Sequence, residues 1–332
     1  MKAMMRHTYG SPEVLELAEI ATPTPEDDEV LLRVQAASVN AIDWRMLRAD
    51  PFLVQLDAGL LRPRNKILGF DVAGRVEAAG RAVKQFQPGD EVFGNLFALR
   101  GGGFAAYVSV PERLLVRKPA NQSFEQAAAV PVAAVTALRG LRDKGHIQAG
   151  QKVLIQGASG GVGTFAVQLA MSFGAEVTAV VRPRNMELAR SLDADHVIDY
   201  TQEDFTRGGQ QYDLILAVNG YHPIAAYRRA LRLGGTYVMA GGAAAQFFQA
   251  LFLGPWLSKS SGRKFGLLET KPNTDDLACV ADLIEAGQVM PVTDRCYPLE
   301  ALPEALRYLE AGHARGKVVI GVVEAQPARH VS

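Results

Sequence analysis

The sequence predicts an α/β protein in which a doubly wound parallel sheet, covered by helices, is joined to a β-rich domain. From residue 152 onward, apolar runs rich in β-branched residues alternate with helical segments through short connections, as in a parallel sheet. A glycine-rich turn separates the first of these runs from the helix after it. Before residue 123, Pro, Gly and Asp punctuate short strand-like runs, which favours a compact β-rich domain.

In the β-rich part, we expect strands over residues 29–37 and 71–78, and a Pro-Gly turn that enters a strand over 87–93. Residues 123–142 are Ala-rich and compatible with a helix, with Pro131 as a start or a break. In the alternating part, the expected strands are 152–156, 176–181, 196–199, 212–218 and 235–240, and the helices are 163–173, 185–192 and 223–231. The strands are continuously apolar, which fits burial on both faces.

After residue 258 the alternation loosens, and we expect a helix over 274–286, a strand over 291–297, a helix over 303–311 and a strand over 317–323. The length of 332 residues suits two domains.

The charge composition of the chain argues against some classes of binding partner. Lys plus Arg and Asp plus Glu both total 35, so neither nucleic acid nor a membrane is expected as the main partner, although a neutral chain can carry a local basic patch. No apolar stretch reaches the length of a membrane span, and the start of the chain lacks an apolar signal region. Cys279 and Cys296 are too few for a disulfide framework. A reducing cytoplasmic setting is therefore expected.

The segment VLIQGASGGVGTFAVQLA predicts a phosphate-binding turn. Gly157, Gly160, Gly161 and Gly163, with Ser159 and Val162 between them, follow a buried strand and open a helix. Glycine permits positive φ and lets backbone N–H groups approach an anion, and the helix N-terminus adds unpaired N–H groups. The spacing Gly-x-x-Gly-x-x-Gly is one residue looser than the usual dinucleotide fingerprint. Tight turns of this kind also occur in α/β proteins that bind no nucleotide, but the strand and helix on either side favour a nucleotide.

The end of the second strand of this part favours NADPH over NADH. An NAD site usually has an acidic residue about 20 residues after the glycine turn, to accept from the ribose 2′-hydroxyl. Here the sequence is VVRPRN, with Arg182 and Arg184 and no acid. Guanidinium groups suit a 2′-phosphate. Either arginine alone could equally stack on adenine or face solvent.

Several motifs, in order along the chain, resemble the zinc-independent quinone oxidoreductase branch of the medium-chain dehydrogenase/reductase superfamily. They are AASVNAID, GFDVAGRV, FQPGDEVFG, GGGFAAYV, ASGGVG, ADHVIDY and ARGKVVI. The resemblance implies a GroES-like catalytic domain over residues 1–125 and 267–332, a Rossmann domain over 126–266, and a homodimer.

The resemblance also assigns site residues. Asn40 matches a residue lining the nicotinamide pocket, and Thr136 one beside the nicotinamide carboxamide; a turn-forming Asn and a capping or core Thr are the alternatives. Tyr200 matches a contact to the adenosine phosphate. Asn219 stands in a turn that departs from the family's Asp-x-Val-Gly, so a backbone contact is expected there. The remaining matches, with backbone facing the nicotinamide or side chains closing over the cofactor, are Ala240, Gly241, Gly242, Arg263 and Phe265.

The stretch 38–43 lacks the Cys or His that zinc-dependent relatives need, and the histidines are scattered, so no metal is expected. Without a metal, the acceptor must already be electrophilic. The expected activity is NADPH-dependent hydride transfer to a quinone or an α,β-unsaturated carbonyl compound, with Asn40 and Thr136 orienting the reactants. A zinc-free dehydrogenase of another carbonyl or alcohol, and an NADPH-binding protein with a regulatory or structural role, remain alternatives. Residues 51–65 are longer than the family pattern and lie near the expected substrate entrance.

Overall fold

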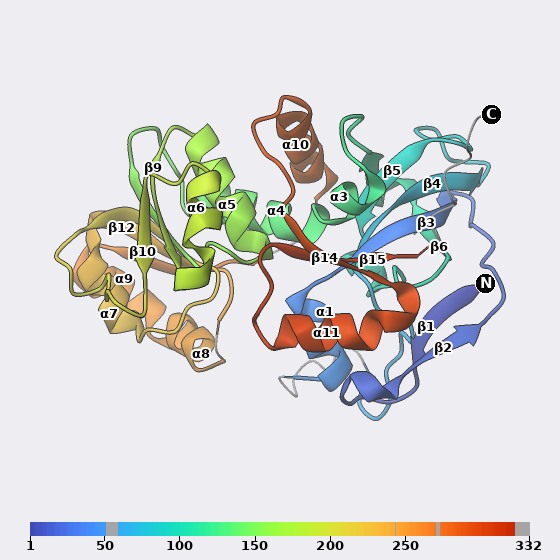
Figure 1. Ribbon diagram of the computed structural model, residues 1–332, viewed down its shortest axis with the longest axis horizontal. Coiled ribbons are helices and arrows are strands. Elements are labelled where there is room, and N and C mark those ends of the chain that lie inside the picture. Colours follow the sequence, from blue (N-terminus) through green and yellow to red (C-terminus); the bar gives the residue numbers. More distant parts are fainter. Residues whose placement is uncertain (51–58, 243, 270–272, 323–332) are drawn as a thin grey trace. The chain divides into compact units, whose positions relative to one another are not determined.

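The computed structural model describes residues 1–50, 59–242, 244–269 and 273–322. The chain divides into two compact units (Figure 1). Unit 1 comprises Met1–Val132, Pro272–Thr274 and Thr293–Ser332, and unit 2 comprises Ala133–Lys271 and Asp275–Val292. The domain boundaries expected at residues 125/126 and 266/267 stay a prediction.

Unit 2 contains a parallel sheet with the strand order β10-β9-β8-β11-β12-β13. The strands are β8 (Lys152–Gln156), β9 (Glu176–Val181), β10 (His196–Asp199), β11 (Tyr212–Ala217), β12 (Leu231–Met239) and β13 (Lys264–Leu267). From β8 the chain adds β9 and then β10 on one side, and from β11 it adds β12 and then β13 on the other side. The carboxyl ends of β8 and β11 therefore form a topological switch point, where open α/β sheets bind ligands.

Helices cover both faces of this sheet, as expected when right-handed crossover connections run outward from its centre in both directions. Helices α5 (Gly161–Ser172) and α6 (Met186–Ser191) pack on β8, β9 and β10. Helices α7 (Ile224–Ala230), α8 (Ala244–Phe252) and α9 (Gly254–Ser261) pack toward β12 and β13 (Figure 1). The core between α7–α9 and the sheet is closed by Tyr227, Tyr237 and Leu257. Helix α10 (Thr274–Glu285) belongs to unit 2 from Asp275 onward.

Unit 1 is built on a mixed sheet with the order β14-β15-β3-β4-β5-β7, and β6 pairs with β3. Its strands are β3 (Glu29–Val39), β4 (Asp71–Ala79), β5 (Glu91–Asn95), β6 (Tyr107–Pro111), β7 (Leu115–Arg117), β14 (Thr293–Pro298) and β15 (Lys317–Gly321). A separate antiparallel pair joins β1 (Lys2–Arg6) to β2 (Leu15–Glu19). The helices are α1 (Ala41–Arg48), α3 (Phe124–Ala128) and α11 (Leu302–Glu310), and α4 (Pro131–Arg139) begins in unit 1 and continues into unit 2.

The predicted fold class is confirmed, with a doubly wound parallel sheet and a mixed β-rich unit. The expected strands 152–156, 176–181 and 196–199 have the bounds of β8, β9 and β10. The expected helix 163–173 begins two residues earlier, because Gly160 is already its N-cap. Of the stretch 51–65, residues 51–58 lie outside the described residues, and 59–65 contain neither helix nor strand. Within the described parts of the chain, no helix is long and apolar enough to cross a membrane.

Candidate active site

The glycine turn after β8 has the geometry that the sequence predicts. Gly157 has φ +82°, and a Cβ there would lie 3.0 Å from Cβ of Asn219. A Cβ on Gly163 would lie 2.1 Å from the carbonyl oxygen of Gly157, so only glycine allows α5 to start so close to the turn. Gly160 differs, because the nearest atom to a Cβ there is the Gly157 oxygen at 3.6 Å. The turn thus leaves space beside Gly160, at the N-terminus of α5, which fits a diphosphate.

A buried amide adjoins this turn. The Asn185 side chain donates from Nδ2 to Oγ of Ser159 at 2.7 Å. Asn185 is buried, and its Oδ1 has no hydrogen-bond partner within the described structure. A buried acceptor of this kind is available to a ligand hydroxyl or amide donor. No sequence motif marks Asn185 as a ligand, because the direction of its side chain depends on the short 3-10 helix Pro183–Asn185.

Arg182 and Tyr200 meet at the carboxyl ends of β9 and β10. Nε of Arg182 donates to the Tyr200 hydroxyl at 2.6 Å. Arg182 and Arg184 are both exposed, at either side of Pro183. The Tyr200 ring also lies 5.5 Å from the ring of Tyr221. Arg182 was selected because VVRPRN lacks an acidic residue, and Tyr200 because of the motif ADHVIDY. The structure shows that the two side chains are hydrogen-bonded to each other.

The ends of β8, β11 and β12 are joined by backbone hydrogen bonds. Asn219 N–H donates to Gln156 O at 3.3 Å, and Gly220 N–H donates to Gly241 O at 3.2 Å. A Cβ on Gly241 would lie 2.4 Å from Val218 O, so the strand ends approach closely. Asn219 and the segment 240–242 therefore lie at the same edge of the sheet as the glycine turn.

Two predicted residues lie elsewhere. Nε of Arg263 donates to Leu231 O at 2.8 Å, at the amino end of β12. Phe265 is buried in the core and pairs with Tyr237 in mid-strand. Both precede the carboxyl end of β13, so the structure does not bring them to the glycine turn. Thr136 is half-buried in the interior of α4, not at its N-cap.

In unit 1, Asn40 precedes α1 as its N-cap. Its backbone N–H donates to Asp43 Oδ2 at 2.7 Å, and Gly69 N–H donates to Asp43 Oδ1 at 3.0 Å. Asp43 is fully buried and caps the first turn of α1. Burial, reinforced by the charge of Asp71, raises the pKa of Asp43 to about 7.

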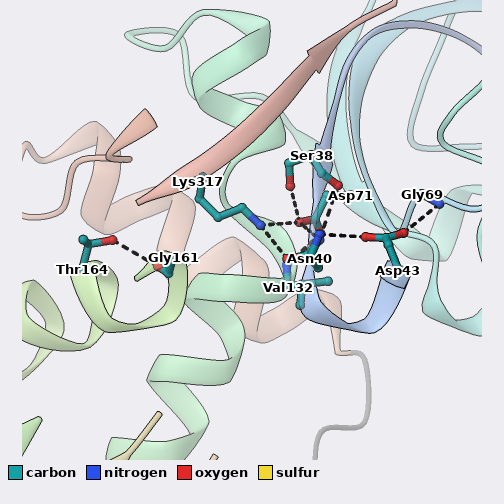
Figure 2. Close-up of polar contacts among 9 residues, drawn as sticks. All are labelled: Ser38, Asn40, Asp43, Gly69, Asp71, Val132, Gly161, Thr164 and Lys317. Carbon is teal, nitrogen blue, oxygen red and sulfur yellow. Dashed lines mark hydrogen bonds and ion pairs between the residues drawn. The ribbon is translucent and has the colours of Figure 1, made fainter. Parts of the chain in front are cut away.

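Asp71 is the centre of a buried polar cluster, which we call the Asp71 cluster (Figure 2). Its Oδ2 accepts from Ser38 Oγ at 2.7 Å, from Asn40 Nδ2 at 2.8 Å and from Lys317 Nζ at 3.3 Å. Its Oδ1 accepts from the Val132 N–H at 2.8 Å, in the first turn of α4. Lys317 Nζ also donates to Asn40 Oδ1 at 2.5 Å. The Asn40 carboxamide is therefore held at both its oxygen and its nitrogen.

Burial lowers the pKa of Lys317, and Asp71 opposes that effect. The sequence showed Lys317 only as part of ARGKVVI, and no pattern linked it to Asp71, which lies 246 residues earlier.

A metal centre finds no support in these side chains. Within residues 1–50, 59–242, 244–269 and 273–322, no group of three or more His, Cys, Asp or Glu side chains could hold a metal ion. The described donor set therefore does not fit zinc.

Comparisons with known proteins agree on one family. Residues 26–120 match the alcohol dehydrogenase GroES-like domain, and residues 192–320 match the zinc-binding dehydrogenase family. The chain is 33% identical to a chloroplast envelope quinone oxidoreductase homolog from Arabidopsis thaliana, over 96% of this chain and 98% of that protein. It is 35% identical to the chloroplastic NADPH-dependent alkenal/one oxidoreductase of the same plant, over 96% of this chain and 79% of that protein. The quinone oxidoreductase from Coxiella burnetii superposes with a TM-score of 0.86 at 30% identity, covering 97% of this chain and 99% of that one.

Proposed function

Because the chain belongs to the quinone oxidoreductase branch of the medium-chain dehydrogenase/reductase superfamily, we propose that it reduces quinones or α,β-unsaturated carbonyl compounds with NADPH. The observation that supports this most directly is the glycine turn at the switch point, with the Arg182–Tyr200 pair beside it. Relatives named for quinone and alkenal/one reduction support the acceptor class.

The residues around the turn fit a dinucleotide. Backbone N–H groups of the turn would bind the diphosphate at the N-terminus of α5. Arg182, fixed by Tyr200, and the neighbouring Arg184 would bind the 2′-phosphate, and no carboxylate stands there to prefer a free 2′-hydroxyl. Asn219 and the backbone of residues 240–242 would face the nicotinamide. When bound, the reduced nicotinamide supplies a hydride.

The chain's own part in the reaction is to bind, orient and exclude water. Asn40, held by Asp71 and Lys317, presents a fixed carboxamide, and Thr136 is the second proposed orienting residue. Quinones and enones suit such a site, because the negative charge that accompanies hydride transfer delocalises onto their oxygen without a metal. The proton that completes the reduction comes from solvent.

The test is steady-state NADPH oxidation against quinones, enones, saturated ketones and alcohols, with and without a chelator. Turnover of quinones or enones that a chelator does not affect is expected. Tight NADPH binding with no turnover on any acceptor would instead indicate a binding protein, and chelator-sensitive alcohol oxidation would contradict the proposal.

Cofactor preference has its own test. Arg182→Ala and Arg184→Ala should weaken NADPH far more than NADH, because only NADPH carries the 2′-phosphate. Arg207→Ala is the matched control, since Arg207 is an exposed arginine of the same unit, paired with Asp204 at 3.3 Å. Equal weakening of both cofactors would refute the assignment.

We also propose a homodimer in a reducing cytoplasmic setting. The free, exposed thiols of Cys279 and Cys296 support the reducing environment. Sedimentation velocity tests the dimer, and cell fractionation tests the location.

A further inference from the structure

The turn that follows β11, residues 219–222, packs directly against the glycine turn. Asn219 N–H donates to Gln156 O at 3.3 Å, and a Cβ on Gly157 would lie 3.0 Å from Cβ of Asn219. The two turns therefore share a close contact. A shift of residues 219–222 would disturb the turn that is proposed to bind the diphosphate.

Two buried side chains, from helices α7 and α8, hold this second turn. The Tyr227 hydroxyl accepts from His222 N–H at 3.4 Å and donates to Gln156 Oε1 at 2.6 Å. Gln246 Nε2 donates to His222 O. Tyr227 and Gln246 are 0% and 6% exposed, so bulk water cannot replace these hydrogen bonds. The backbone of His222 is therefore bonded, at both its N–H and its carbonyl oxygen, to side chains from outside the turn.

The chemistry of both contacts suits this role. Burial raises the pKa of Tyr227, so its hydroxyl keeps the proton that it donates to Gln156. A Cβ on Gly220 would lie 3.1 Å from the Tyr227 hydroxyl and 2.6 Å from Gln246 Oε1. The two polar groups can approach the backbone of the turn this closely because residue 220 is glycine.

Unpaired polar atoms are concentrated around the same turn. Five buried side-chain nitrogen or oxygen atoms have no hydrogen-bond partner within the described structure, and three of them are Gln156 Nε2, His222 Nε2 and Gln246 Oε1. Unpaired buried groups cost stability, and a partly satisfied polar network makes a less stable core than apolar side chains do. These side chains are therefore better explained by the geometry that they impose on the turn than by stability.

We propose that Tyr227 and Gln246 are positioning residues for the cofactor, which act through residues 219–222 without touching it. By fixing this turn, they keep the glycine turn in the conformation that would bind the diphosphate. NADPH and NADH share the diphosphate, so both cofactors depend on these side chains to the same degree. This inference rests on the proposed function. It differs from the arginine assignment, which concerns only the 2′-phosphate of NADPH.

The test compares Tyr227→Phe with Tyr237→Phe. Tyr237 is the matched control, because it is 1% exposed in the same core and its ring centroid lies 4.5 Å from that of Tyr227. Its hydroxyl makes no hydrogen bond to the described residues. In calorimetric titrations, Tyr227→Phe should raise the Kd of NADPH and that of NADH by about fivefold, whereas Tyr237→Phe should match the wild type. In steady state, Tyr227→Phe should raise KM for NADPH and leave kcat nearly unchanged, as expected when only binding is lost.

A second pair of variants gives an independent answer. Gln246→Leu removes the other hydrogen bond to the turn and should raise both dissociation constants by a similar factor. Gln249→Leu is its control, because Gln249 lies three residues further along α8 and its Oε1 accepts from Ile224 N–H at 3.0 Å, outside residues 219–222. Circular dichroism and thermal midpoints establish that each variant is folded.

The outcomes separate this inference from the proposed function. Dissociation constants that change equally in a variant and its control would overturn this inference alone. The same holds if the constants stay at the wild-type level in both Tyr227→Phe and Gln246→Leu, or if NADPH weakens and NADH does not. A wild-type protein that binds neither cofactor would overturn the proposed function as well.

Discussion

Replacing Lys317 with Met should destabilise unit 1 severely. Asp71 is fully buried and Lys317 is 3% exposed, so solvent cannot replace the lost ammonium group. Asp71 would keep its bonds from Ser38, Asn40 and Val132 but lose the positive charge at 3.3 Å. Removing one partner of a buried pair typically costs ~3–5 kcal/mol, a large share of the ~5–15 kcal/mol that stabilises a domain.

The assay is urea unfolding followed by fluorescence in a Trp256→Phe background, where Trp44 reports on unit 1. The double variant Lys317→Met with Asp71→Asn removes both charges. It should therefore be more stable than the sum of the two single effects implies, by ~2 kcal/mol or more.

An exposed ion pair provides the control. Arg81 and Asp27 lie 2.7 Å apart with side chains 85% and 59% exposed, so Arg81→Met should cost less than ~1 kcal/mol. If Lys317→Met costs no more than this control, or if the double variant shows no coupling, the argument from buried charge is wrong.

Three further predictions concern ionisation, the glycine turn and the cofactor pair. Folding raises the pKa of the Asp43 carboxyl from 3.8 to about 7, so the folded state keeps this proton to higher pH than the unfolded state does. The free energy of unfolding should therefore fall by up to ~4 kcal/mol between pH 4 and 8. In Asp43→Asn, the urea midpoint should not show this fall with pH. Gly163→Ala should prevent the turn from forming, because its Cβ would meet Gly157 O at 2.1 Å, whereas Gly160→Ala should fold normally by circular dichroism yet bind NADPH more weakly by calorimetry. Tyr200→Phe should lower NADPH affinity by about fivefold and leave NADH affinity unchanged, because Arg182 loses the hydrogen bond that holds its guanidinium group in place. Equal losses of affinity for both cofactors would contradict a role of this pair in binding the 2′-phosphate.

Much of unit 2 could be predicted because its strands bury both faces, so their sequences are continuously apolar and end at glycines or polar residues. The bounds of β8 and β9 follow from this pattern alone. Helices α8 and α9 were missed for the opposite reason. In α8 the phenylalanines point outward and the glutamines inward, so its apolar face does not mark the side that packs on the core. Helix α9 begins with Gly254 and Pro255, which interrupt the apolar run.

The candidate site divides in the same way. The glycine turn is local, so its residues and their purpose follow from a short segment of sequence. The Asp71 cluster joins β3, β4, α4 and β15, and Asp71 and Lys317 each look like an ordinary first residue of a strand. The structure places the Arg263 side chain at the amino end of β12, which a local sequence pattern does not reveal, because the pattern does not say which end of a strand a side chain reaches.

The pairing of β15 with β3 has a consequence for how the chain is made. Since β15 follows the whole of unit 2 in the chain, Asp71 is synthesised long before its buried partner Lys317. Unit 2 can complete its sheet while the first-made segment still waits for its last strand. The sheet of unit 1 therefore cannot be completed until β15, near the end of the chain, has been synthesised.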